Sequence, residues 1–225
     1  MSWQHIRPAT LAWQITSQAV STKLLTQTPF PVKQIRLAAG AEGVIRGLVL
    51  VQEGSARLPN RNTLGRGDLL WRKQDQLIRS GSEGILWSVL ELPPALEPSE
   101  ATLTIGVADK PWQAFEDPVG RPTQPVQVLL EGKLSALRTR FAPTYEAGEH
   151  WHDFDTLYFI MDGDMQFGFE GQYYTGDVRQ VQGGFSYGPE KPGPQGVEFV
   201  LFSCGGPVNL HWSDLDIPPR GSLKP

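Results

Sequence analysis

The stretch that decides the fold reads GEHWHDFDTLYFIMDG at residues 148–163 and continues, after a short interval, as TGDVRQVQGGFSYGP at residues 175–189. Its first part places His150 and His152 two positions apart. In a β-strand, residues i and i+2 point to the same face. The two imidazoles therefore point into one space, as a metal site built on a sheet requires.

The composition favours a soluble all-β protein. The chain has 225 residues, enough for one large or two small domains. Hydrophobic residues make up 40% and charged residues 20% of the chain, which is ordinary for a globular protein. The 24 glycines and 19 prolines are spread along the chain, which favours many short strands and turns over long helices.

Charge and apolar patterning argue against several classes of partner. The net charge of −4 provides no basic surface, so we expect no nucleic-acid partner. No apolar run approaches the roughly 20 residues of a membrane span, and the N-terminus lacks the pattern of a secretory signal. The single cysteine, Cys204, excludes an intrachain disulfide and fits a reducing compartment. These features predict a cytoplasmic protein with no membrane partner.

The sequence repeats itself at an offset of 109 residues. The turn Asp162-Gly163 corresponds to Glu53-Gly54, and the pair Gly176-Asp177 corresponds to Gly67-Asp68. In both copies the Gly-Asp glycine lies 13 positions after the turn glycine, and an apolar segment follows. A repeat with the same internal spacing predicts the duplication of one structural unit.

The repeat divides the chain into three parts. Residues 1–98 form the first unit, which ends in a segment with three prolines at residues 92–98. Residues 99–125 are Pro-rich and irregular, and we interpret them as a linker that wraps the second unit. Residues 126–225 form the second unit and carry the histidine pair.

The second unit resembles the cupin superfamily. The first cupin motif contains His-x-His, a Glu a few residues later, and a Gly seven residues after that Glu. In this chain His150, His152 and Gly163 match the motif, whereas Thr156 stands at the Glu position.

The second cupin motif is matched less completely. It reads Gly, five residues, Pro-x-Gly-x-x-His. Gly176 and Gly184 match it, but Gln182 stands at the Pro position and Tyr187 at the His position. The usual ligand set of three His and one Glu is therefore half present.

The resemblance implies that the whole chain is a bicupin, with two antiparallel jelly-roll barrels in one chain. It implies a site at the mouth of the second barrel only. The offset places the ligand positions of the first barrel on residues that bind no metal, namely Ala41, Gly43, Gly47 and Ile78. Cupin barrels often pair through exposed sheet edges, which implies a homodimer unless the two barrels satisfy each other within the chain.

The candidate metal ligands are His150 and His152, completed by a third ligand for which Tyr187, Asp155 and Asp153 are the candidates. Tyr187 stands where the family has its histidine. Asp155 is adjacent to the family's Glu position, although simple alternation from His152 points it outward. The resemblance implies a divalent ion, either Fe, Zn, Mn or Ni.

The candidate pocket residues include side chains that alternate with the histidines or share their space. We expect Thr156, Tyr158, Phe167 and Tyr187 to contact a small organic ligand. Tyr187 and Tyr158 are the candidate catalytic residues, each as a proton donor.

Two classes of function fit these residues. One is a metal-dependent cupin enzyme of small-molecule metabolism, either a dioxygenase, an isomerase or a lyase, since fold does not choose between them. The other is a non-catalytic bicupin that binds a metabolite and has lost its metal, which the missing Glu and the missing second-motif His support.

Overall fold

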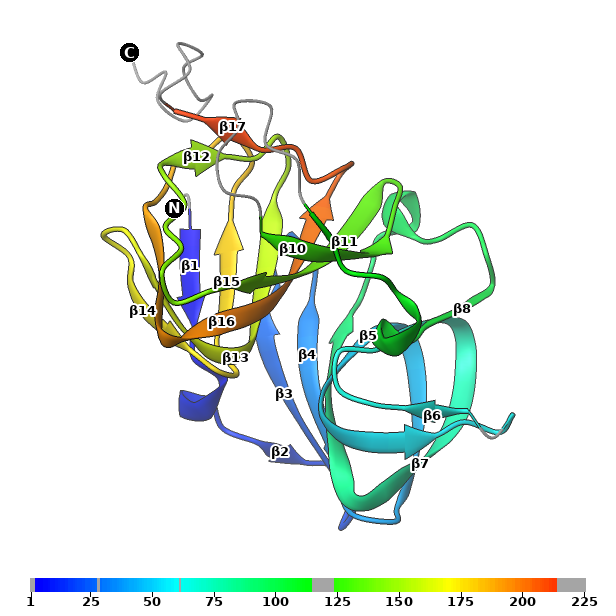
Figure 1. Cartoon of the computed structure of the whole chain (residues 1–225). Helices are drawn as coiled ribbons and strands as arrows, with labels where there is room; N and C mark the ends of the chain where they lie inside the picture. The colour runs from blue at the N-terminus through cyan, green and yellow to red at the C-terminus, as the bar shows by residue number, and fades with distance from the viewer. Residues whose placement is uncertain (1–2, 28, 61, 115–123, 214–225) are drawn as a thin grey trace. The chain divides into compact units, whose positions relative to one another are not determined.

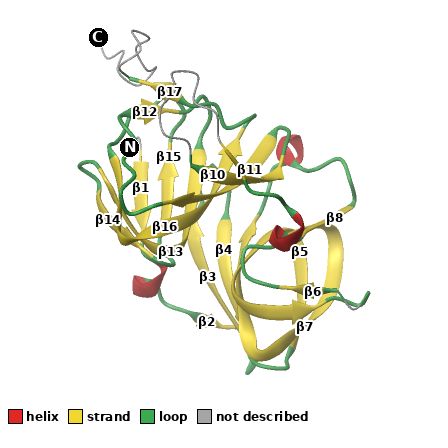
Figure 2. Cartoon of the chain, in the orientation of Figure 1, coloured by secondary structure: helices red, strands yellow, loops and turns green. Residues whose placement is uncertain are grey.

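The structure is a computed structural model that describes residues 3–27, 29–60, 62–114 and 124–213. These residues form seventeen strands and three short 3-10 helices, so the predicted all-β class is confirmed (Figure 2). The helices are η1 (Pro8–Thr10), η2 (Pro94–Leu96) and η3 (Val107–Asp109). None of the described helices is long and apolar enough to cross a membrane.

The chain divides into two compact units. The N-terminal unit spans Thr10–Lys110, and the C-terminal unit combines Met1–Ala9 with Pro111–Pro225. The boundary falls inside the segment predicted as a linker, residues 99–125. That segment contributes β8 (Thr102–Ile105) to the N-terminal unit, and β9 (Gln113–Ala114) and the start of β10 (Pro125–Leu130) to the C-terminal unit, while its residues 115–123 lie outside the described part of the chain.

The N-terminal unit contains one seven-stranded sheet in the order β2-β3-β4-β7-β5-β6, with β8 paired to β7. Its longest strand, β7, pairs with β5 along two stretches, so that Leu48 lies beside both Trp71 and Leu90. A strand that meets the same partner twice must bend back, which folds the sheet over its own core. The strands are β2 (Gln14–Ile15), β3 (Val20–Thr26), β4 (Val32–Leu37), β5 (Glu42–Arg57), β6 (Thr63–Leu64), β7 (Leu69–Leu90) and β8 (Thr102–Ile105).

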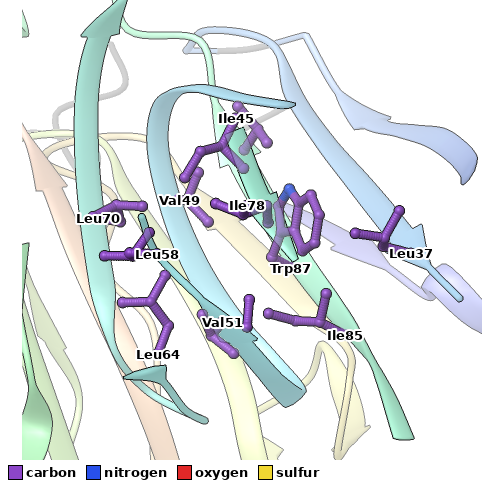
Figure 3. Packing of buried hydrophobic residues seen from close by; sticks show 12 residues of the cluster. Leu37, Ile45, Val49, Val51, Leu58, Leu64, Leu70, Ile78, Ile85 and Trp87 are labelled. Atoms are coloured by element: carbon purple, nitrogen blue, oxygen red, sulfur yellow. The ribbon is translucent and has the colours of Figure 1, made fainter. Parts of the chain in front are cut away.

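Apolar side chains fill the interior of the N-terminal unit. Trp87 lies at the centre of a cluster with Leu37, Val51 and Ile85, each nearly inaccessible to solvent (Figure 3). Ile78, which stands where the repeat places a cupin ligand, packs in the same cluster. The inward positions of this barrel are therefore occupied by hydrophobic packing.

The C-terminal unit contains an eight-stranded antiparallel sheet in the order β1-β15-β13-β16-β11-β10-β9, with β14 paired to β13. A two-stranded sheet, β12 with β17, adds to it. The strands are β1 (Trp3–Ile6), β9 (Gln113–Ala114), β10 (Pro125–Leu130), β11 (Leu134–Phe141), β12 (His150–Trp151), β13 (Thr156–Phe167), β14 (Gly171–Tyr174), β15 (Val178–Val181), β16 (Glu190–Cys204) and β17 (His211–Trp212).

Strand β1 belongs to the sheet of the C-terminal unit, beside β15 (Figure 1). Trp3 pairs with Val181, and the ring of His5 stacks on Tyr173 at 3.6 Å between centroids. The division predicted from the sequence placed all of residues 1–98 in the first unit, whereas the strand Trp3–Ile6 pairs with the second unit. Strand pairing between segments 172 to 178 positions apart leaves no local pattern to detect.

The repeat predicted from the sequence has matching geometry in the two units. The turn glycines Gly54 and Gly163 both have positive φ, +71° and +74°. A Cβ at Gly54 would lie 2.2 Å from a backbone oxygen, and one at Gly163 would lie 2.1 Å from the equivalent oxygen. Both turns therefore require glycine for the same reason, the close approach of a neighbouring strand.

Candidate functional site

The small sheet β12–β17 and the segment around Tyr187 hold His150 in place. His150 lies opposite Trp212 in the β12–β17 pairing. Its backbone also exchanges two hydrogen bonds of 2.9 Å with Tyr187. The carbonyl of His152, at the following turn, accepts a bond of 2.7 Å from the N–H of Gly184. Both imidazoles are buried, with His150 2% and His152 5% exposed.

Backbone carbonyls fix the tautomer of both histidines. Nδ1 of His150 lies 2.8 Å from the carbonyl oxygen of Gly148, and Nδ1 of His152 lies 2.7 Å from that of Asn209. A carbonyl only accepts, so Nδ1 carries the proton in each ring. In the neutral rings Nε2 then has the lone pair. The ring centroids are 5.5 Å apart.

A cavity of about 80 Å³ opens beside these rings. Its polar lining comes mainly from His150, His152, Tyr158 and Glu190, and Thr139 and Gln124 also contribute. Most of the remaining wall is apolar and includes Phe141, Phe199, Leu201, Val208, Leu210 and Trp212. The prediction of a pocket beside the histidine pair therefore agrees with the geometry.

Two tyrosines connect His152 to the barrel interior. The hydroxyl of Tyr158 lies 3.3 Å from Nε2 of His152, and it also contacts the hydroxyl of Tyr187. Because Nδ1 of His152 is the protonated nitrogen, Tyr158 donates to Nε2 and accepts from Tyr187. Burial lowers the pKa of His152 to about 4 and raises the pKa of Tyr158, so all three groups are neutral at pH 7.

A buried ion pair lies behind Tyr187. Arg179 donates to Glu170 at 2.7 and 2.5 Å, and neither side chain is more than 1% exposed. The guanidinium carbon of Arg179 lies 3.9 Å from the ring centre of Tyr187 and 4.1 Å from that of Phe167. The barrel interior beyond the pocket is thus filled by a charge pair and aromatic rings.

Glu190 supplies the carboxyl group among the described residues that line the pocket. Its side chain is 3% exposed, and Oε1 lies 3.9 Å from Nε2 of His150 without a hydrogen-bond partner. Burial raises the pKa of Glu190 to about 7, although the charge of Arg179 lowers it. A buried carboxylate oxygen without a partner is costly, so its position in a pocket requires a functional explanation.

Only some of the residues predicted for the site line the pocket. His150, His152 and Tyr158 line the pocket, and Tyr187 lies directly behind Tyr158. The side chain of Asp155 turns away, because Oδ1 accepts a hydrogen bond of 2.8 Å from the N–H of Gly183.

Thr156 and Phe167 are not among the pocket residues either. Thr156 is 1% exposed, and its hydroxyl has no partner among the described groups. Phe167 packs in the core cluster of the barrel, against the rings of Tyr158 and Tyr173. Phe167 therefore supports the ring of Tyr158 from outside the cavity.

Sequence reasoning missed Glu190. Alternation from Tyr187 would place Glu190, three positions later, on the opposite face. Gly188 has a φ of +123°, which interrupts the alternation and returns the carboxyl to the pocket. The available signal was the Gly-Pro pair after Tyr187, which indicates a break in strand geometry but not its direction.

Among the described residues, no three histidine, cysteine or carboxylate side chains already surround a common point at metal-binding distance. His150, His152 and Glu190 nevertheless line the same pocket. Nε2 of His152 contacts the hydroxyl of Tyr158, and Oε1 of Glu190 lies 3.9 Å from Nε2 of His150.

Comparison with solved structures identifies the fold. The oxalate decarboxylase of Lactobacillus farciminis in its formate complex matches 93% of this chain and 88% of its own, with a TM-score of 0.68 and 11% identity. A mutant of the Bacillus subtilis oxalate decarboxylase matches with a TM-score of 0.62 and 12% identity over 93% of this chain and 78% of its own. The fold is the cupin jelly roll.

A third structure, the Bacillus subtilis enzyme analysed for its Mn(II) centres, matches with a TM-score of 0.63 and 12% identity over 93% of this chain and 78% of its own. No protein-family model and no curated protein matches the sequence. At 11–12% identity these cupin structures share an architecture with this chain, and its chemistry must be argued from its own side chains.

Proposed function

We propose that the C-terminal cupin barrel binds a divalent metal ion on Nε2 of His150 and His152, with a small organic molecule beside it in the pocket. The main observation behind this proposal is that Nδ1–H of each histidine is hydrogen-bonded to a backbone carbonyl, that of Gly148 for His150 and that of Asn209 for His152. Metal-ligating histidines usually donate their other ring N–H in this way, which fixes the tautomer and the ring orientation.

The charge state of His152 supports metal binding. A ligating imidazole must be unprotonated. The pKa of about 4, which results from burial, keeps this ring neutral at pH 7. The ion would displace the hydroxyl of Tyr158 from Nε2. Once bound, a divalent ion polarises a carbonyl or carboxylate oxygen of the ligand.

The pocket wall indicates the kind of molecule. None of the described residues that line the pocket is a lysine or an arginine, and most of its wall is apolar. Apart from the proposed ion, a small dianion such as oxalate would find no cationic side chain among these lining residues. We infer a ligand with an apolar body and one carbonyl or carboxyl end, which faces His150, His152 and Tyr158.

Lyase chemistry is the reaction class that the neighbours support, because they are decarboxylases. Tyr158 is the best-placed proton donor, since its hydroxyl lines the pocket and is linked to Tyr187. The proposed role of Tyr187 is to hold and supply that proton from behind.

Metal analysis tests the proposal. The protein is purified without chelator, incubated with Mn(II), Fe(II), Zn(II) or Ni(II), and desalted. We expect about one ion per chain in the unmodified protein and less than about a tenth of that in a His150→Ala/His152→Ala variant. Equal metal content in the two proteins would contradict the site.

A metal-free binding pocket is the second candidate. The contact between Tyr158 and His152 favours it, because this contact already satisfies Nε2 without an ion. In that case small carboxylic acids and ketones would raise the melting temperature in the presence of EDTA. The metal-dependent proposal expects the same compounds to bind only after metal has been loaded.

A further inference from the structure

We propose that Glu190, at a position where neither cupin motif has a ligand, is the third protein ligand of the metal held by His150 and His152. The inference rests on the proposed function, since it concerns the same ion. It replaces Tyr187, Asp155 and Asp153, the candidates that the sequence supplied for this position.

The backbone brings Glu190 to the histidine pair. Tyr187 pairs with His150, and Glu190 pairs with Ala147 three residues earlier on the facing segment. Backbone hydrogen bonds of 2.9 to 3.0 Å hold both pairs. The carboxyl of Glu190 therefore reaches the pocket from a segment tied directly to the one that carries His150.

The carboxyl of Glu190 is buried in the pocket, and its Oε1 forms no hydrogen bond. The side chain of Glu190 is 3% exposed. Glu170, the other buried glutamate nearby, differs because it forms a bidentate pair with Arg179. A carboxylate left without a partner in a buried pocket is stabilised if a cation binds there.

The distance suits a shared ion after a small adjustment. Two atoms bound to one ion at about 2.1 Å lie about 3.0–3.4 Å apart at octahedral or tetrahedral angles. Oε1 of Glu190 lies 3.9 Å from Nε2 of His150. A shift of the carboxyl by about 0.5–1 Å reaches that range and needs only a small rotation of the side chain.

The other candidate ligands already form hydrogen bonds or ion pairs with other groups. Asp155 accepts from the N–H of Gly183, and the hydroxyl of Tyr187 is bonded to that of Tyr158. The carboxylate of Asp153 lies 3.0 Å from His211 and accepts from Asn209. Each would have to give up an existing partner in order to bind the ion, whereas Oε1 of Glu190 would gain one.

Two histidines and one carboxylate leave coordination positions open. This donor set suits ions such as Fe(II), and the remaining positions can accept two oxygens of one ligand. The neutral imidazoles and one carboxylate leave a net charge of +1 with a divalent ion. The inferred ligand class is therefore a monocarboxylate that chelates through its carboxylate and a neighbouring oxygen.

A titration with Mn(II), repeated with Zn(II), tests the role of Glu190. The full chain is compared with Glu190→Gln, and Glu149→Gln is the matched control, because Glu149 is exposed on the adjacent segment and bonds Ser186. We expect Glu190→Gln to weaken the dissociation constant by at least about 10- to 100-fold and to change the electron paramagnetic resonance spectrum of bound Mn(II). Glu149→Gln should change neither.

Folding does not confound this test. Glu190→Gln removes a costly buried ionisable group, so we expect its melting temperature to be at least that of the unmodified protein. Wild-type affinity and an unchanged spectrum in Glu190→Gln would overturn the third ligand but leave the histidine pair. If the unmodified chain binds neither Mn(II) nor Zn(II), the third ligand and the proposed function are both overturned.

Discussion

The hydroxyl of Tyr158 donates a hydrogen bond of 3.3 Å to Nε2 of His152, the same nitrogen that we propose as a metal ligand. One lone pair cannot serve both partners. The site therefore has two alternative states, one in which the tyrosine holds the imidazole and one in which an ion replaces it. Metal affinity is set by the difference in free energy between them.

Replacement of Tyr158 by phenylalanine should tighten metal binding. The change removes the competing donor, and one hydrogen bond of this kind contributes about 0.5–1.5 kcal/mol. We expect the dissociation constant for Mn(II) to fall about two- to tenfold. The hydroxyl of Tyr187 loses its acceptor, so the free energy of unfolding should fall by about 1–3 kcal/mol. Metal titration and urea denaturation measure the two effects.

Tyr173→Phe is the matched control for Tyr158→Phe. Tyr173 is fully buried in the same barrel, but its hydroxyl bonds Glu170 at 3.1 Å and is not among the pocket groups. The control should lose stability without a change in metal affinity. Weaker metal binding in Tyr158→Phe would show that the hydroxyl assists the ion instead of competing with it.

Glu190 and His152 should give the metal-free protein opposing pH dependences. Burial depresses the pKa of His152 from 6.5 to about 4, so its stability contribution is present above pH 6.5 and is lost as pH falls to 4. Burial raises the pKa of Glu190 from 4.5 to about 7, so its contribution is present below pH 4.5 and is lost as pH rises to 7. Each amounts to roughly 3 kcal/mol at most.

Single variants should separate these two titrations. In EDTA, the stability of Glu190→Gln relative to the unmodified protein should increase as pH rises from 4.5 to 7. The relative stability of His152→Gln should increase as pH falls from 6.5 to 4. Urea denaturation at half-unit pH intervals measures both slopes. Parallel curves for all three proteins would mean that neither group titrates as its burial implies.

Gly188 should be required for both stability and metal binding. Its φ is +123°, and a Cβ there would lie 2.9 Å from the carbonyl oxygen of Gly148 and 3.0 Å from Cα of Glu149. Gly188→Ala should therefore push apart the segments that carry Glu190 and His150. We expect a loss of about 1–3 kcal/mol in unfolding free energy and at least tenfold weaker Mn(II) binding.

Gly176→Ala separates backbone strain from crowding. Gly176 also has a positive φ, +91°, but a Cβ there would meet no atom within 4 Å. It should cost about 1 kcal/mol and leave metal affinity unchanged. Equal effects of the two substitutions on metal binding would mean that the approach of the segments at Gly188 does not position the ligands.

The pair of Arg179 and Glu170 should dominate the stability of the barrel interior. Glu170→Gln leaves a fully buried guanidinium without its counter-charge, which typically costs about 3–5 kcal/mol. Lys191→Met is the control, because Lys191 and Glu146 form an ion pair that is half-exposed on both sides and contributes little. Urea denaturation measures the loss of unfolding free energy in both variants, from the shift of the midpoint at an unchanged m-value. A small effect of Glu170→Gln would mean that water reaches Arg179.

The sequence determined features that depend on neighbours along the chain. Alternation placed the imidazoles of His150 and His152 on one face, and the spacing of the turn glycines predicted two equivalent units. These signals are readable because a two-residue period and a positive φ are local properties. The glycines Gly54 and Gly163 confirm this, since both approach the backbone of a neighbouring strand in the same way.

Tertiary structure decided which groups meet the histidines. Glu190 reaches the pocket because Gly188 breaks the alternation and because its segment pairs with Ala147, 43 positions away. Tyr187 stands at the position of a histidine ligand in the second cupin motif, yet its hydroxyl is hydrogen-bonded to that of Tyr158. Pairing between distant segments is chosen by the packing of the whole barrel, so the identity of the third group at the site could be found only after the chain had folded.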